Sequence, residues 1–295
     1  MRSKISYFNA AIFSKNLSRF YLLALLYLAA VCMVLPLVLS TSLASYGREL
    51  GYELTMLYTV ENVYDSTQLV TFISFFGAPC AAMAIFSYLY SARSANMMGS
   101  LPVRREAMFL SGVAAVYAVV IASDIIAVLL AFAVTLPKEL MLGKYLIEWL
   151  LISLGQFTLF FGLAALCAVL TGSILAMPAI YLCANLAVLG LASAIQSAVN
   201  HVLYGLRVYV PDWLIRFSPI FWLNNQGAHT NGESYADIHY TMSAGVAWYA
   251  AAGAAMLVIA FFIHRARRME TAGDVMSIKL LRPVFKVLLS LGVGV

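Results

Sequence analysis

The chain has 295 residues, of which 63% are hydrophobic and only 11% are charged. A soluble domain has roughly 45–50% apolar and about 25% charged residues, so this composition excludes an ordinary soluble protein. The formal net charge of +5 does not indicate nucleic-acid binding, because the basic residues lie beside apolar segments, where they set topology and contact membrane lipids. We predict an all-α, polytopic membrane protein.

Residues 1–19 predict an amphipathic helix that lies along the cytoplasmic surface of the membrane. Its apolar positions recur every three to five residues and are Ile5, Phe8, Ile12, Phe13 and Leu17, with Lys4, Lys15 and Arg19 around them. Aromatic and basic residues in this pattern are typical of interfacial anchors. A frayed amphipathic tail is the alternative.

Residues 20–263 contain six apolar stretches, each long enough as a helix to cross a hydrocarbon core of about 30 Å. We place the spans at about Phe20–Ser40, Gln68–Tyr90, Met108–Thr135, Leu146–Leu170, Ile174–Val199 and Met242–Ile263. Because only three residues separate the fourth span from the fifth, these two are expected to form a tight antiparallel hairpin.

The distribution of basic residues predicts the orientation of these spans. Six crossings place both ends of the chain on one side, and 13 of the 18 lysines and arginines lie on that side. The positive-inside rule therefore places the N-terminus and the tail in the cytoplasm. We expect a multi-pass protein of the bacterial plasma membrane.

Two features of the later spans predict how they pack. Residues 200–241, on the outer side, are rich in aromatic residues, which favour the headgroup layer; we expect short re-entrant helices there. Small residues recur at every fourth position in two series, Gly190, Ala194, Ala198 and Ala247, Ala251, Ala255. Such series allow close approach of helices, either within one chain or between two copies.

Residues 264–295 form a basic segment without an apolar period. The segment leads into nine apolar residues that end at Val295, too few to cross a membrane as a helix. We interpret the segment as a cytoplasmic tail followed by the start of a truncated seventh span.

No sequence motif indicates chemistry in this chain. Walker A, GxGxxG, GxSxG and HExxH patterns are all absent from the sequence, so no ATPase or hydrolase site is expected. The four cysteines fall inside spans and the four histidines lack ligand spacing, so neither a disulfide framework nor a metal site is expected. We predict that the chain is not an enzyme and has no cofactor of its own.

Asp124 is the one carboxylate deep within a predicted span. An ionised Asp near the centre of a membrane helix costs roughly 2.5–3.5 kcal/mol on insertion scales, so its presence needs a reason. It is either a substrate or proton contact that faces the bundle interior, or a structural polar residue bonded to a neighbouring helix. The candidate partners are Gln156, Asn185 and Gln196.

The loop 91–107, between the second and third spans, is the most distinctive hydrophilic segment. Its sequence predicts a short helix over residues 92–98 and a turn at Gly99, Ser100 and Pro102. Its arginines serve in part to fix topology, but the adaptable Met and Leu side chains beside them suit docking into a groove of a partner. The candidate contact residues are Arg93, Asn96, Met97, Met98, Leu101, Pro102, Arg104, Arg105 and Glu106.

Two stretches resemble a known family. The segment YSARSANMMGSLPVRREAMF resembles the loop between the second and third spans of ABC type 2 export permeases of Gram-positive bacteria, and ETAGDVMSIKLLRPVFK resembles a stretch after their sixth span. The likeness covers essentially the whole chain. It implies an elbow helix at the N-terminus, a six-helix transmembrane domain and a coupling helix within residues 92–105.

The resemblance also implies partners and a function. A separate ATP-binding cassette subunit, carrying ATP and Mg²⁺, would dock on the coupling helix, and a second permease half or another copy would complete the transporter. The chain would be the permease subunit of an exporter of amphiphilic or peptide- or drug-like solutes. The alternatives are an ion- or proton-coupled secondary transporter that uses Asp124, and a non-transporting membrane immunity or scaffold protein.

Overall fold

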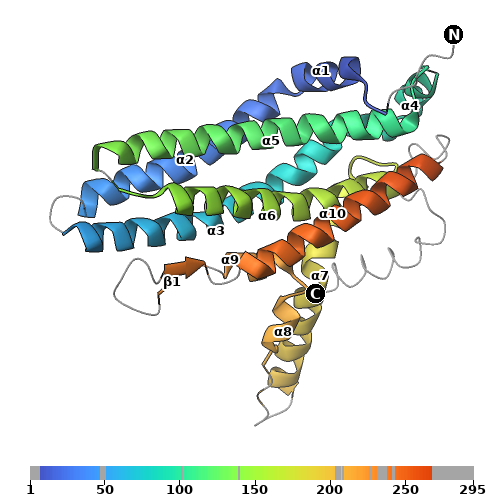
Figure 1. The fold of residues 1–295 in the computed structure, drawn as a ribbon. Helices are drawn as coiled ribbons and strands as arrows, with labels where there is room; N and C mark the ends of the chain where they lie inside the picture. Colours follow the sequence, from blue (N-terminus) through green and yellow to red (C-terminus); the bar gives the residue numbers. More distant parts are fainter. Residues whose placement is uncertain are drawn as a thin grey trace.

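The computed structural model describes residues 7–46, 51–100, 102–138, 140–202, 207, 209–225, 228–230, 238–240 and 243–267. The helices are α1 (Ala10–Arg19), α2 (Tyr21–Tyr46), α3 (Tyr52–Ile85), α4 (Ala92–Gly99), α5 (Arg105–Thr135), α6 (Gly143–Leu170), α7 (Ala176–Val202), α8 (Asp212–Ile215), α9 (Pro219–Asn224) and α10 (Ser243–Ala266), with 3-10 turns η1 (Ser87–Leu89) and η2 (Leu136–Lys138). The strands β1 (Ala228–Thr230) and β2 (Ile238–Tyr240) form an antiparallel hairpin (Figure 1).

Within the described part of the chain, six helices are long and apolar enough to cross a membrane: α2, α3, α5, α6, α7 and α10. The prediction of an all-α, multi-pass membrane protein is confirmed, although the β1–β2 hairpin was not foreseen. The predicted seventh span and nearly all of the tail lie outside the described residues.

The largest error in the predicted spans concerns α3, which begins at Tyr52 rather than Gln68. Its first half carries Glu53, Glu61 and Asp65. These charges lower the local hydropathy, so a prediction based on apolar stretches misses this part of the helix. At about 1.5 Å per residue, its 34 residues extend for about 50 Å, well beyond a hydrocarbon core.

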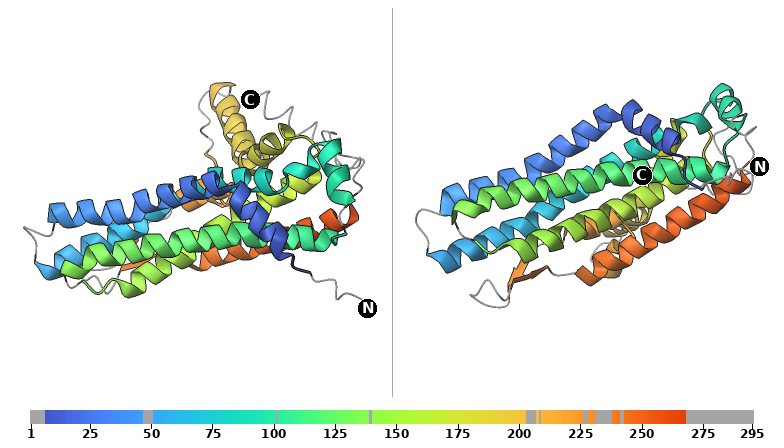
Figure 2. Two further views of the ribbon diagram at one scale, coloured as in Figure 1. Left: turned by 90° about the horizontal axis from the view of Figure 1, so that it is seen from above. Right: turned by 45° about the horizontal axis from the view of Figure 1, so that its top comes forward.

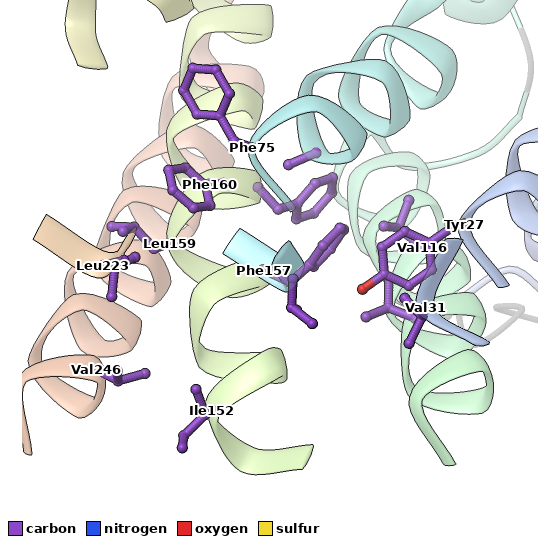
Figure 3. Packing of buried hydrophobic residues seen from close by; sticks show 14 of the residues in the cluster. Tyr27, Val31, Phe75, Val116, Ile152, Phe157, Leu159, Phe160, Leu223 and Val246 are labelled. Atoms are coloured by element: carbon purple, nitrogen blue, oxygen red, sulfur yellow. The ribbon is translucent and has the colours of Figure 1, made fainter. Parts of the chain in front are cut away.

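The centre of the bundle is α6, with α3 on one side and α10 on the other (Figures 1 and 2). In its most apolar stretch 67% of the residues are buried, against 11% in α7. Large side chains of α6, including Trp149, Phe157, Phe160 and Phe161, are fully buried. The rings of Phe160 and Phe75 meet edge to face at 5.5 Å (Figure 3), an arrangement that adds to the burial of apolar surface.

The contact between α6 and α10 depends on glycines. A Cβ atom at Gly162 would collide with the backbone of Gly253, and one at Gly253 would collide with the backbone of Thr158. About two turns earlier on α6, a Cβ at Gly155 would come within 2.9 Å of Val246. The two backbones are therefore in direct contact, as in other close helix pairs in membranes.

Neither predicted series of small residues makes a contact of this kind within the described chain. Ala247, Ala251 and Ala255 are exposed, and no atom lies within 4 Å of a Cβ built on Gly190. The packed face of α10 is a neighbouring one that includes Val246, Ala250 and Gly253.

The connection between α6 and α7 is as short as predicted, but the expected antiparallel hairpin is wrong. Instead α7 leaves the bundle at a steep angle (Figures 1 and 2). Only Met177, Tyr181 and Asn185 are buried along it, and all three lie in its first three turns. The Tyr181 hydroxyl donates to the Phe75 carbonyl at 2.9 Å, so the start of α7 is anchored to α3 while the remainder projects.

The predicted short helices of residues 200–241 are present as α8 and α9. In α9, Ile220, Trp222 and Leu223 are buried, and the Trp222 ring lies 4.9 Å from that of Tyr249 on α10. This helix therefore packs into the end of the bundle, whereas Trp213 of α8 stays 59% exposed.

Candidate functional site

The described basic residues that flank α4 gather at one end of the bundle, which we name the basic end. There α3, α6 and α10 end, α2 and α5 begin, and α4 protrudes (Figures 1 and 2). The helix α1 lies at the same end and crosses α5, and the Asn9 N–H donates to the Ser111 hydroxyl at 2.8 Å. The Asn9 side chain also caps α1 by accepting from Ala11 and Ile12.

The predicted helix of the loop 91–107 is present as α4, which extends one residue further, to Gly99. Ala95 is its only buried residue, while Arg93, Asn96 and Met97 are exposed and Met98 is half-buried. The helix thus presents one basic and one thioether side chain to its surroundings. Of the remaining predicted contact residues, Pro102 is exposed and Leu101 lies outside the described residues.

The residues that follow the turn are engaged with the rest of the chain. The Arg104 guanidinium lies over the Tyr7 ring at 5.2 Å and 4.0 Å from the Glu106 carboxylate. Glu106 also pairs with Arg265 of α10 at 3.2 Å. Arg105 donates to the Arg267 carbonyl at 2.8 Å. Arg105 and Glu106 therefore join α5 to α10, whereas Arg104 contacts Tyr7 and Glu106.

Arg267, just beyond α10, contacts α6, η1 and α5 at the basic end. It was not identified as a candidate residue from the sequence. Only 7% of its surface is exposed. Its Nη1 donates to the Val169 carbonyl at 2.7 Å and its Nη2 lies 3.4 Å from the Leu89 carbonyl. These carbonyls belong to the ends of α6 and η1, where unpaired acceptors attract a cation. Burial lowers the pKa of this guanidinium.

A second contact joins the same elements. The Tyr88 hydroxyl of η1 lies 2.7 Å from Nε2 of His264 on α10, and the His264 ring packs between Phe86 and Phe109. Burial raises the pKa of Tyr88, so its hydroxyl stays protonated at neutral pH. We call Arg105, Glu106, Arg265 and Arg267, with their partners, the basic-end clamp.

The intramembrane acid Asp124 is fully buried in α5. Its Oδ2 accepts a hydrogen bond from the Ser153 hydroxyl of α6 at 2.9 Å. The Tyr27 hydroxyl of α2 lies beside this pair, with Ser74 of α3 next to it. Oδ1 of Asp124 has no hydrogen-bond partner. Four helices thus bring one polar side chain each to a single point in the core.

The hydrogen-bonding partner of Asp124 is therefore none of the three predicted amides. Gln156, one turn after Ser153, is fully buried, and neither atom of its amide has a partner. Asn185 donates to the Tyr181 carbonyl at 2.9 Å, and Gln196 lies on the projecting part of α7. Spacing along one helix could not reveal Tyr27 or Ser74, because they come from other helices.

Among the described residues, no group of three His, Cys, Asp or Glu side chains could hold a metal ion. No protein-family model, curated protein or solved structure matches the chain. The resemblance to ABC type 2 permeases therefore stays a prediction.

Proposed function

We propose that the chain is the membrane-spanning permease subunit of an ATP-binding cassette exporter. It would lie in the bacterial plasma membrane with its N-terminus and tail in the cytoplasm. A separate cassette subunit would hydrolyse ATP, and a second permease half or another copy would complete the pathway. The cargo would be an amphiphilic or peptide- or drug-like solute.

The observation that carries this proposal is the position of α4. It is an exposed helix at the basic end, it joins two membrane-spanning helices, and Arg93, Asn96 and Met97 face outward. Arginine and methionine are enriched where proteins dock, and methionine adapts to a groove of irregular shape. A partner with an acidic and apolar groove would complement this surface.

The basic-end clamp gives α4 a mechanical connection to the bundle. A force on α4 reaches α5 through the short turn, and Arg105 then passes it to the backbone of Arg267. Arg267 in turn holds the end of α6 through the Val169 carbonyl. An ATP-driven partner would act by shifting the equilibrium between two states of the bundle, and the clamp would transmit that shift from α4.

The test is purification of the tagged chain from its native membranes, with co-purifying proteins identified by mass spectrometry. We expect a protein with a Walker A motif and measurable ATP hydrolysis. The double variant Arg93→Glu, Met97→Glu should lose this partner while the chain still inserts and elutes as a single species, because both side chains are exposed.

The matched control is Met141→Glu, Lys144→Glu, which changes an exposed methionine and lysine at the opposite end of the bundle. This variant should retain the ATPase. If the α4 variant retains it as well, or if no cassette protein is found with the wild-type chain, the proposal is wrong. Arg104 and Arg105 are poor choices for this test, because changing them also disturbs the clamp.

A second candidate function is gradient-driven transport through Asp124. A fully buried acid with one unpaired oxygen is typical of proton or ion relays in membranes. In this case Asp124→Asn should abolish ethidium movement driven by a pH gradient in vesicles that lack ATP. Under the leading proposal the same vesicles show no ethidium movement until the cassette subunit and ATP are supplied.

A further inference from the structure

An apolar crevice of about 460 Å³ opens between α2, α3 and α5. Carbon atoms line it almost entirely. Small side chains form much of its floor, so the helices leave space between them; these residues are Ala24, Ala30, Gly77, Ala81 and Ala84. The buried side chains of Tyr27, Val116 and Phe157, which Figure 3 shows close to one another, also line the crevice.

The length of the crevice matches one leaflet of a membrane. Its lining runs from Phe20, just before α2, to Ala30 within α2, and along α3 from Ile85 back to Phe72. At about 1.5 Å per helical residue these stretches extend for about 15–20 Å. A hydrocarbon core is about 30 Å thick, so one leaflet contributes about 15 Å. The crevice therefore runs from the basic end to about the middle of the bilayer.

The mouth of the crevice is basic. Asn16, Leu17 and Phe20 line it where α1 meets α2. The Arg19 guanidinium lies over the Phe20 ring at 5.1 Å, and Lys15 is exposed on the same helix. Because α1 contains no acidic residue, this end of the crevice favours an anion at the level of the lipid headgroups.

We propose that the crevice binds one anionic phospholipid from the leaflet at the basic end. An acyl chain fills the carbon-lined space, and the headgroup phosphate lies against Lys15 and Arg19. A free anion would use only the mouth, and a peptide would leave most of its backbone polar groups without partners along the carbon-lined walls. The site is independent of the transport proposal and stands whether or not the chain binds an ATPase.

The test is native mass spectrometry of the full chain in detergent, titrated with dioleoyl phosphatidylglycerol, dioleoyl phosphatidylcholine or inorganic phosphate. Each basic residue near a headgroup strengthens binding about fivefold, so the anionic lipid should bind about 5- to 30-fold more tightly than the zwitterionic one. Lys15→Gln, Arg19→Gln should remove this preference. Lys144→Gln, at the opposite end, should leave it unchanged.

A second pair of variants tests the acyl chain. Gly77→Leu, Ala81→Leu places two large side chains in the crevice, and a Cβ at Gly77 itself makes only ordinary contact with Tyr27 at 3.5 Å. This variant should lose both lipids. Ala122→Leu, Ala133→Leu also places two leucines, on exposed positions of α5 outside the crevice, and should bind like the wild type.

Cys80 provides a readout that needs no variant. It is exposed and lines the crevice, whereas Cys183 lies on α7. Phosphatidylglycerol should slow alkylation of Cys80 by N-ethylmaleimide and leave Cys183 unaffected. The proposal is overturned if both lipids bind equally, if the filled crevice binds as well as the wild type, if inorganic phosphate displaces the lipid, or if Cys80 is not protected.

Discussion

Arg267 carries a buried charge without a carboxylate partner in the described structure. Its guanidinium instead faces the carbonyls of Val169 and Leu89, which end two separate elements. A planar group with five donors can serve both acceptors at once, and an ammonium group cannot reproduce this geometry. One side chain therefore fixes the relative positions of α6, η1 and the end of α10.

We expect Arg267→Ala to destabilise the protein by about 2–3 kcal/mol, because hydrogen bonds to a charged group are lost and buried carbonyls are left unpaired. Thermal unfolding in detergent should show the loss as a lower midpoint. Arg265→Ala is the control: its partner Glu106 is shared with Arg104, and its own side chain is 63% exposed, so the change should cost less than about 1 kcal/mol. Equal effects of the two variants would contradict the assigned role of Arg267.

The sequence predicted the exposure of individual residues well where that exposure depends only on their position in a local element. Arg93 and Met97 were expected on an exposed helix, and they are exposed on α4. It could not predict that Arg105 and Glu106 would turn toward α10, because their partners Arg267 and Arg265 are about 160 residues away in the chain. Ser153, and not an amide, is the partner of Asp124, because the rotation of α6 in the bundle decides which of its side chains faces Asp124 and the sequence does not specify that rotation.

At the level of helices, the close packing of α6 against α10 depends on which glycines of the two helices face each other. Gly155 and Gly162 lie seven residues apart on α6, and both face α10. The alanine series of α10 has the expected spacing but lies on an exposed face. Spacing alone therefore identifies a helix face made of small side chains, but it does not show whether another helix packs against that face.

We expect Gly162→Ala and Gly253→Ala each to force α6 and α10 apart, at a cost of about 1–3 kcal/mol for overpacking a tight contact. The measurement is the unfolding midpoint in detergent, together with the amount of protein in the membrane. Gly190→Ala on α7 makes the same chemical change where nothing lies within 4 Å and should be neutral or slightly stabilising. A neutral Gly162→Ala would show that the two backbones are not in contact in the folded protein.

The helices themselves were predicted with unequal success, for a physical reason. Continuous apolar stretches such as α5 were placed to within about three residues. The start of α3 was missed because its charged first half has no hydropathy signal. The direction of α7 was missed because a short connection limits the distance between two helix ends and not the angle between the helices.

At the scale of the whole molecule, the arrangement predicts which surfaces face each aqueous side. Met97 of α4 and Met141 before α6 lie at opposite ends and are 57% and 83% exposed. In a variant that lacks Cys32, Cys80, Cys167 and Cys183, a membrane-impermeant maleimide added to intact cells should label Met141→Cys and not Met97→Cys. Inside-out vesicles should give the reverse pattern. Labelling of Met97→Cys in intact cells would place α4 outside the cytoplasm.

The glycine contacts between α6 and α10 also have a consequence for biosynthesis. About 90 residues separate Gly162 from Gly253, and a ribosome adding about 5–20 residues per second needs roughly 5–20 s to cover them. Throughout that interval α6 lies in the membrane without α10, so the face of α6 that carries Gly155 and Gly162 is not yet covered. The helix α10 thus completes the centre of the bundle, and packing around α6 cannot finish until α10 has left the translocon.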